Sequence, residues 1–169
     1  MYNRPLVPPD FLVPDRLDCG TFHLRMLAIG DFEKDYAAVM ASAERLTGLL
    51  DPDSPWPAGL TLEEDMIDLA WHQREFTLRH SFAYTVMSND GIDCLGCCYI
   101  FPSNVPAYDA TAFYWVREGS DALERDRDLG NVLRNWLKDV WPFRAVAFPG
   151  RDITWPVWRR HEALAAETI

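Results

Sequence analysis

The chain has 169 residues, of which 49% are hydrophobic and 25% are charged. This composition excludes a disordered or collagen-like protein and predicts one domain that spans residues 1–169. Acidic residues outnumber basic ones by 26 to 16, so the formal net charge is −10 and the pI is about 4.7. Because so acidic a chain neutralises phosphates poorly, we expect neither a nucleic-acid partner nor a membrane partner.

The N-terminal segment, residues 1–20, is predicted to be an extended arm, because prolines interrupt it at positions 5, 8, 9 and 14. It lacks the basic stretch followed by an apolar stretch that is typical of a signal peptide. No apolar run in the sequence approaches the roughly 20 residues that span a bilayer. The expected location is therefore the cytoplasm.

The first half of the chain predicts one strand and two helices. The strand covers residues 21–27, where polar and apolar residues alternate. The helix that follows begins near residue 31, and its apolar residues recur at helical spacing: Phe32, Tyr36, Val39, Met40 and Ala43. After a proline-rich loop over 50–60, Thr61 and Glu64 form a capping box that starts a second helix, which ends near residue 79.

The second half predicts a sheet with helices around it. Its strands are expected at 82–87, 92–101, 111–117 and 144–148, and its helices at 128–140 and 155–167. A short Asn-Asp-Gly link makes the first two strands an antiparallel hairpin. A strand–helix–strand unit favours a parallel crossover for the last two. The predicted fold class is therefore α/β (α+β), with a mixed, largely antiparallel sheet flanked by helices.

Cys94 and Cys97 form a C-x-x-C motif, which is found in redox and zinc sites. In a regular strand, residues three apart point to opposite faces, with Cα atoms about 10 Å apart. A disulfide needs Cα atoms within about 7 Å. A structural zinc site also needs a second ligand pair, and the sequence has no other C-x-x-C motif or close His pair. We therefore predict buried thiols in a sheet and no metal site.

The junction between the strand at 111–117 and the helix at 128–140 contains Arg127-x-x-Gly130-x-Val132. A glycine in the first turn of a helix leaves the backbone N–H groups unobstructed. With the helix dipole, these N–H groups suit an anion such as a pyrophosphate. A neighbouring arginine adds a charge-assisted contact. The alternative is that Gly130 permits close packing of the helix on the sheet and that Arg127 is solvated.

This stretch resembles the GCN5-related N-acetyltransferase (GNAT) superfamily. In that family, a strand ending in an aromatic–Val pair leads to a Gln/Arg-x-x-Gly-x-Gly/Ala loop, which opens a helix and cradles the pyrophosphate of acetyl-CoA. Here the pair is Trp115-Val116, and the preceding strand carries a family-like glycine, Gly96, before an apolar run. The order of predicted elements also matches over residues 21–148.

The resemblance implies a GNAT-like fold, acetyl-CoA as co-substrate and transfer of the acetyl group to a small amine. Attack geometry would come from splayed strands at 94–101 and 111–117. The cofactor-binding residues that it implies are Trp115, Val116, Arg117, Arg127, Gly130, Asn131 and Val132.

Acyl transfer to an amine needs a base. His72 and Glu75 are three residues apart on a predicted helix and share a face, and Tyr99 and Tyr114 lie on central strands where a hydroxyl could act as an acid. These four are the candidate catalytic residues. For each of them the alternative is a packing or surface role.

Two further hypotheses remain open. The first is a catalytically inactive GNAT-fold protein that uses its cleft for another ligand or partner. The branched Val132 and the absence of any tyrosine after Tyr114 favour it. The second is a thiol protein built on the C-x-x-C motif. Trp141, Trp155 and Trp158 gather near the C-terminus and suit either a homodimer interface, an aromatic substrate or the core.

Overall fold

The computed structural model describes residues 4–167, which form a six-stranded sheet in the order β1-β2-β3-β4-β5-β6. All neighbouring strands are antiparallel except β5 and β6, which are parallel. The predicted sheet is therefore confirmed. The strands are β1 (Arg16–Asp18), β2 (Phe22–Met26), β3 (Phe82–Ser88), β4 (Cys94–Pro102), β5 (Ala110–Val116) and β6 (Val146–Ala147). β1 lies within the predicted N-terminal arm and was not expected to join the sheet.

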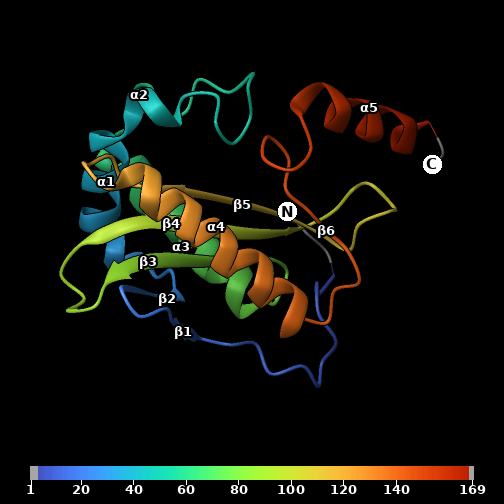
Figure 1. Cartoon of the computed structure of the whole chain (residues 1–169), viewed down its shortest axis with the longest axis horizontal. Helices are drawn as coiled ribbons and strands as arrows, with labels where there is room; N and C mark the ends of the chain where they lie inside the picture. Colours follow the sequence, from blue (N-terminus) through green and yellow to red (C-terminus); the bar gives the residue numbers. More distant parts are fainter. Residues whose placement is uncertain (1–3, 168–169) are drawn as a thin grey trace.

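Helices cover both faces of this sheet (Figure 1). In Figure 1, α4 crosses one face, α1 and α3 lie behind the other, and α5 stands beyond β6. Within the described part of the chain, no helix is long and apolar enough to cross a membrane. The helices are α1 (Phe32–Ala41), α2 (Ala43–Leu46), α3 (Leu62–Thr77), α4 (Ala122–Asp139) and α5 (Trp155–Ala166), with a 3-10 turn at Ile29–Asp31.

The sheet separates two apolar clusters, because successive residues of a strand point to opposite faces. On the α4 side, the cluster includes Leu24, Cys98, Tyr114 and Leu133. On the side of α1 and α3, it includes Val39, Leu69, Tyr99 and Trp115. Neighbouring residues of β4 and β5 thus belong to different cores, and this division decides which candidate residues can meet.

A β-bulge interrupts the alternation in β4. Val86 of β3 pairs with Gly96 and Met87 pairs with Cys94, so Leu95 is an extra residue. Gly96 has a φ of 150°, and a Cβ there would lie 2.1 Å from the carbonyl oxygen of Trp115. Only glycine fits this close approach.

The bulge changes the orientation of the C-x-x-C motif. Cys94 and Cys97 both belong to the cluster facing α1 and α3, whereas Cys98 belongs to the α4 cluster. The prediction that Cys94 and Cys97 point to opposite faces is therefore wrong. The prediction assumed that side chains alternate between the two faces at every residue of the strand. The extra residue interrupts this alternation between the two cysteines, so both thiols point to the same face.

Two of the three C-terminal tryptophans pack inside the chain. Trp141 and Trp158 are each only 4% exposed, and Trp141 contacts the rings of Phe82 and Trp136. Trp155 is half-buried, and its ring stacks on Phe113. Core packing therefore accounts for Trp141 and Trp158.

Candidate active site

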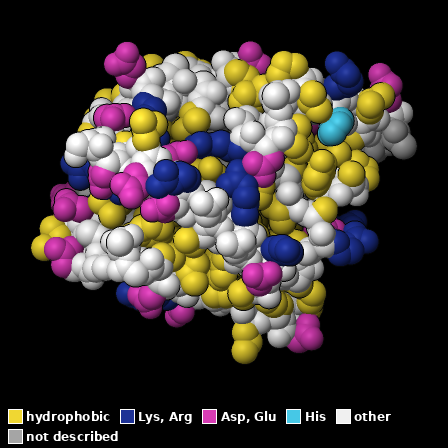
Figure 2. Space-filling model, in the orientation of Figure 1, with side chains coloured by type: hydrophobic (Ala, Val, Ile, Leu, Met, Phe, Trp, Pro, Cys, Tyr) yellow, Lys and Arg dark blue, Asp and Glu magenta, His cyan; other side chains and the backbone are white. Residues whose placement is uncertain are grey.

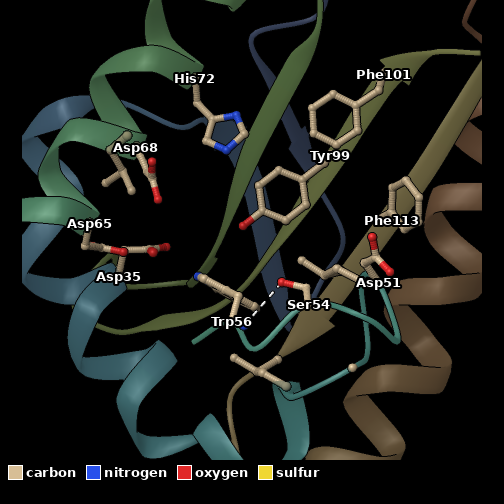
Figure 3. Close-up of a pocket in the computed structure, with 14 residues that line it drawn as sticks. Asp35, Asp51, Ser54, Trp56, Asp65, Asp68, His72, Tyr99, Phe101 and Phe113 are labelled. Carbon is tan, nitrogen blue, oxygen red and sulfur yellow. Dashed lines mark hydrogen bonds between the residues drawn. The ribbon is translucent and has the colours of Figure 1, made fainter. Parts of the chain in front are cut away.

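A cavity of about 270 Å³ lies on the α1–α3 side of the sheet. Its walls come from α1, α3, β4, β5 and the loop that follows α2, a segment between residues 48 and 56 (Figure 3). The cavity therefore combines side chains from five sequence regions, and its volume suits a small ligand.

Aromatic side chains form one wall of the cavity. Tyr99 and Phe101 are two residues apart on β4, so they share a face, and their rings stack with centroids 6.0 Å apart. Phe113 on β5 and Trp56 in the loop complete the wall. The Tyr99 hydroxyl points into the cavity in Figure 3 and accepts a hydrogen bond from Nε1 of Trp115 at 3.1 Å. Such a wall can bind a cationic ligand through ring faces.

Carboxylates form the opposite wall. Burial raises the pKa of Asp35 to about 8 and the pKa of Asp65 to about 7, and it also raises the pKa of Asp68. Asp35 and Asp65 stand side by side in Figure 3, and the Asp35 charge contributes to the raised pKa of Asp65. Because a nearby positive charge would offset this cost, the cavity favours a cationic ligand over an anionic one.

His72 lies between these two walls. Its ring comes from α3 and stacks on Tyr99, with centroids 5.1 Å apart. Burial lowers the pKa of His72 to about 4, so the imidazole is neutral at physiological pH. No described residue hydrogen-bonds its Nδ1. The structure therefore places this predicted catalytic residue in the cavity as a neutral imidazole.

Glu75 and Tyr114 do not join His72. Glu75 is fully buried and forms an ion pair with Arg74. Its Oε2 lies 3.2 Å from Nδ1 of His80. Glu75 is not among the residues that line the cavity. Tyr114 belongs to the α4 side of the sheet. Of the four candidate catalytic residues, the structure therefore brings together only His72 and Tyr99.

The helix α4 begins at Ala122, six residues before the predicted start near Asp128. Arg127 and Gly130 therefore lie inside the helix, where helical hydrogen bonds occupy backbone N–H groups. The predicted loop that opens the helix at this point is wrong. The apolar pattern of the helix does not show its first turns, because Asp126 takes an inward position there and accepts hydrogen bonds from Arg45 and Arg151.

The four implied cofactor residues on α4 have separate environments. Arg127 is exposed and lies near Glu124 and Asp128, and Asn131 is exposed. Val132 packs against the core on the α4 side. A Cβ at Gly130 would lie 2.4 Å from the hydroxyl oxygen of Tyr114, so this glycine permits close packing of the helix on β5, the alternative stated above.

The other three implied cofactor residues lie at the end of β5. Trp115 and Val116 are fully buried, and Val116 pairs with Gly96. The side chain of Arg117 is about one third exposed, and its Nη1 lies 3.6 Å from Oδ1 of Asp93. A short loop joins this strand end to the N-terminus of α4 at Ala122. These residues therefore stand beside the true start of the helix.

The expected splay between β4 and β5 is also wrong. These strands stay paired from Gly96 opposite Val116 to Pro102 opposite Ala110. The sheet opens instead between β5 and β6, which pair only at Ala110 and Thr111. In this opening, Arg151 donates a hydrogen bond to the Tyr114 carbonyl at 3.3 Å and lies over the Tyr114 ring.

Sequence reasoning missed most of the cavity. Asp35 stands three and four residues before buried Ala38 and Val39, and Asp65 stands four residues before buried Leu69. A carboxylate on the apolar stripe of a helix is the signal that could have found both. Trp56, Phe101 and Phe113 carry no comparable signal.

Several solved structures resemble the fold of this chain. An acetyltransferase from Agrobacterium tumefaciens aligns over 94% of this chain and 84% of its own, with 18% identity and a TM-score of 0.58. Ribosomal-protein-S5-alanine acetyltransferase from Vibrio fischeri aligns over 73% and 67%, with 13% identity and a TM-score of 0.55.

A third similar structure is the microcin C7 self-immunity acetyltransferase MccE in complex with acetyl-CoA and AMP. It aligns over 76% of this chain and 71% of its own, with 11% identity and a TM-score of 0.55. No family model and no curated protein matches the sequence. The chain therefore has the fold of the GNAT acetyltransferases, as its sequence resemblance predicts.

Proposed function

We propose that this protein transfers an acetyl group from acetyl-CoA to a primary amine, and that the acceptor is a small cationic amine. The observation that carries this proposal is the cavity, in which aromatic rings face carboxylates on a sheet of the acetyltransferase type. Ring faces and carboxylates both attract an ammonium group. The Vibrio fischeri neighbour is named for a ribosomal-protein acceptor, so an amine of a protein is the competing substrate class.

The proposed chemistry starts with an ammonium ion held by the carboxylates. The ammonium group first passes one proton to a cavity carboxylate such as Asp65, whose pKa burial raises to about 7, and this frees the nitrogen lone pair. The amine nitrogen then forms a bond to the thioester carbonyl carbon, and the carbon–sulfur bond breaks. Burial raises the pKa of Tyr99, so its hydroxyl stays protonated until it donates its proton to the leaving thiolate. The neutral His72 accepts the second proton, which the nitrogen loses as the carbon–nitrogen bond forms, and the return of this proton to the Tyr99 oxygen restores both side chains.

Acetyl-CoA would bind at the end of β5, near Trp115, Val116 and Arg117. The N-terminus of α4 at Ala122 supplies the positive end of a helix dipole there, and Arg117 supplies a charge. Arg151 donates a hydrogen bond to the Tyr114 carbonyl beside β5, so it is a second positive charge near this strand. An enzyme of this kind would work in the cytoplasm, and size-exclusion chromatography would test whether it is a homodimer.

The experiment is an acetyl-CoA titration by calorimetry, followed by an assay of free CoA release across a panel of amines. The panel contains polyamines, amino sugars and peptides with free N-termini. We expect saturable acetyl-CoA binding and release that depends on a cationic small amine.

Three results decide among the hypotheses. Preference for the peptides would overturn the small-amine assignment. Binding without turnover on any amine would favour the inactive alternative. The absence of both binding heat and a thermal shift with acetyl-CoA would sink the proposal.

A further inference from the structure

Three potential metal ligands converge beneath the cavity, and the two cysteines among them take no part in the acyl transfer proposed for the cavity. They are Asp35 of α1 and the two cysteines Cys94 and Cys97 of β4, all buried, with their ligand atoms within 4.8 Å of one another. Sγ of Cys97 lies 3.1 Å from Oδ1 of Asp35, and Sγ of Cys94 lies 3.8 Å from the same oxygen. The bulge at Leu95 and Gly96 makes this convergence possible, since it turns both thiols to one face.

The spacing of these atoms matches a tetrahedral zinc site. Zinc–sulfur bonds of about 2.3 Å and zinc–oxygen bonds of about 2.0 Å place sulfur and oxygen ligands about 3.5 Å apart. The two sulfur–oxygen distances, 3.1 and 3.8 Å, lie on either side of that value. Two thiolates select a thiophilic ion such as Zn²⁺ over Mg²⁺ or Ca²⁺, which take oxygen ligands.

A second observation points independently to a cation. Asp65 of α3 is only 3% exposed, and its Oδ2 has no hydrogen-bond partner among the described residues. It stands beside Asp35 in Figure 3, and both residues line the cavity. Two carboxylates buried side by side are costly without a positive charge between or beside them. The cavity also gives an ion a path from solvent to Asp35.

We propose that Asp35, Cys94 and Cys97 bind a thiophilic divalent cation, best matched by zinc, on the floor of the cavity. The fourth position faces the cavity, where Asp65 and water are the available oxygen donors. Binding releases the thiol protons to solvent, with no change in oxidation state. Three protein ligands and one accessible position would make the ion part of the cavity surface. This proposal does not depend on acyl transfer.

The test uses the full-length protein, reduced and freed of metal, with Co²⁺ as the spectroscopic probe. We expect one equivalent of Co²⁺ to give visible bands of tetrahedral geometry and a thiolate-to-cobalt charge-transfer band. One equivalent of Zn²⁺ should remove both. We also expect Zn²⁺ to raise the melting temperature of the wild-type protein.

Variants assign the ligands. Cys97→Ser and Asp35→Asn should each weaken Co²⁺ binding by at least about 100-fold, since loss of an outer-shell partner alone costs 10–100-fold. Cys98→Ser is the matched control, because Cys98 is a buried thiol on the same strand but faces the α4 cluster. It should keep the wild-type spectrum. Circular dichroism checks that each variant is folded.

Several outcomes would overturn the proposal. One is the absence of tetrahedral Co²⁺ bands in the reduced wild-type protein, a result that requires no variant. Another is equal Co²⁺ affinity in folded Cys97→Ser and wild type. A third is a Cys94–Cys97 disulfide in the purified protein, with no metal binding after its reduction.

Discussion

The ionisable side chains on the two faces of β5 differ in how they are paired. On the α4 face, Asp126 is paired with Arg45 and Arg151, and Arg134 is paired with Asp152. Figure 2 shows this side of the molecule, where basic and acidic side chains are interspersed. On the cavity face, Oδ2 of Asp65 and Nδ1 of His72 have no hydrogen-bond partner among the described residues.

This difference indicates which polar groups stabilise the fold and which could bind a ligand. Paired charges on the α4 face hold the helix and the loop after β6 in place, so they need no ligand. Unpaired buried polar atoms carry a free-energy cost that a bound ligand or ion can remove. The cavity face is therefore the better candidate for chemistry, and the following predictions test this contrast.

The largest expected effect comes from Gly96→Ala. The added Cβ would lie 2.1 Å from the Trp115 carbonyl oxygen, a backbone atom that cannot move away alone. We expect a loss of about 4 kcal/mol in the free energy of unfolding, measured by urea denaturation. Gly91→Ala is the control, because no atom lies near its Cβ, and it should cost about 1 kcal/mol. Equal losses in both variants would refute the role of the bulge.

Gly130→Val tests the α4 face. Its Cβ would meet the Tyr114 hydroxyl and the Arg134 guanidinium, so we expect a loss of about 3 kcal/mol in urea denaturation. Asn131→Val is exposed on the same helix and should cost less than about 1 kcal/mol. In the folded fraction, affinity for acetyl-CoA should not change. A loss of affinity with unchanged stability would restore Gly130 as a cofactor residue.

The pH dependence of stability tests the cavity face through His72. Burial lowers its pKa to about 4 in the folded state, whereas the ordinary value is 6.5. Between these values the unfolded chain binds a proton that the folded chain does not, so stability falls as the pH falls. From pH 7 to pH 5 this effect amounts to about 2 kcal/mol.

His72→Phe removes the titrating group and keeps an aromatic ring. The variant should therefore lose about 2 kcal/mol less stability than wild type between these two pH values, measured by urea denaturation at each. Comparison of the two proteins cancels the contribution of the other titrating groups. Parallel losses would show that His72 titrates normally in the folded protein.

The smallest effect concerns the acceptor. Asp68→Asn removes one carboxylate from the cavity and should raise KM for a cationic amine about tenfold, with little change in kcat, because it weakens binding of the charged substrate. Asp53→Asn is the control, since Asp53 is exposed and lies outside the cavity. An unchanged KM in Asp68→Asn would mean that the acceptor binds elsewhere.

The elements that the sequence predicted well have regular periodicity. The helix from Leu62 to Thr77 has a capping box at Thr61 and Glu64, and both hydrogen bonds of that box are present. The hairpin of β3 and β4 follows from its short turn, and the parallel pairing of β5 and β6 follows from the helix between them. Local rules decide these features, so the sequence is sufficient.

The errors arose where distant residues decide the structure. Asp126 occupies an inward position of α4 only because Arg45 and Arg151 reach it from elsewhere in the chain. The bulge at Leu95 depends on the register with β3. Tyr99 and His72 meet because α3 packs over this face of the sheet. Of the predicted catalytic residues, only these two lie in the cavity.

The bulge also alters how residues between Cys94 and Cys97 should be counted. Since Leu95 has no opposite residue in β3, the two cysteines are three apart in sequence but only two apart in paired positions. A deletion of Leu95 would therefore leave the two cysteines two residues apart in a regular strand, with both thiols on the same face. A substitution that abolished the bulge without shortening the chain would place the two thiols on opposite faces of the sheet. In homologous chains, a motif with one intervening residue in a regular strand is thus the geometric equivalent of C-x-x-C here.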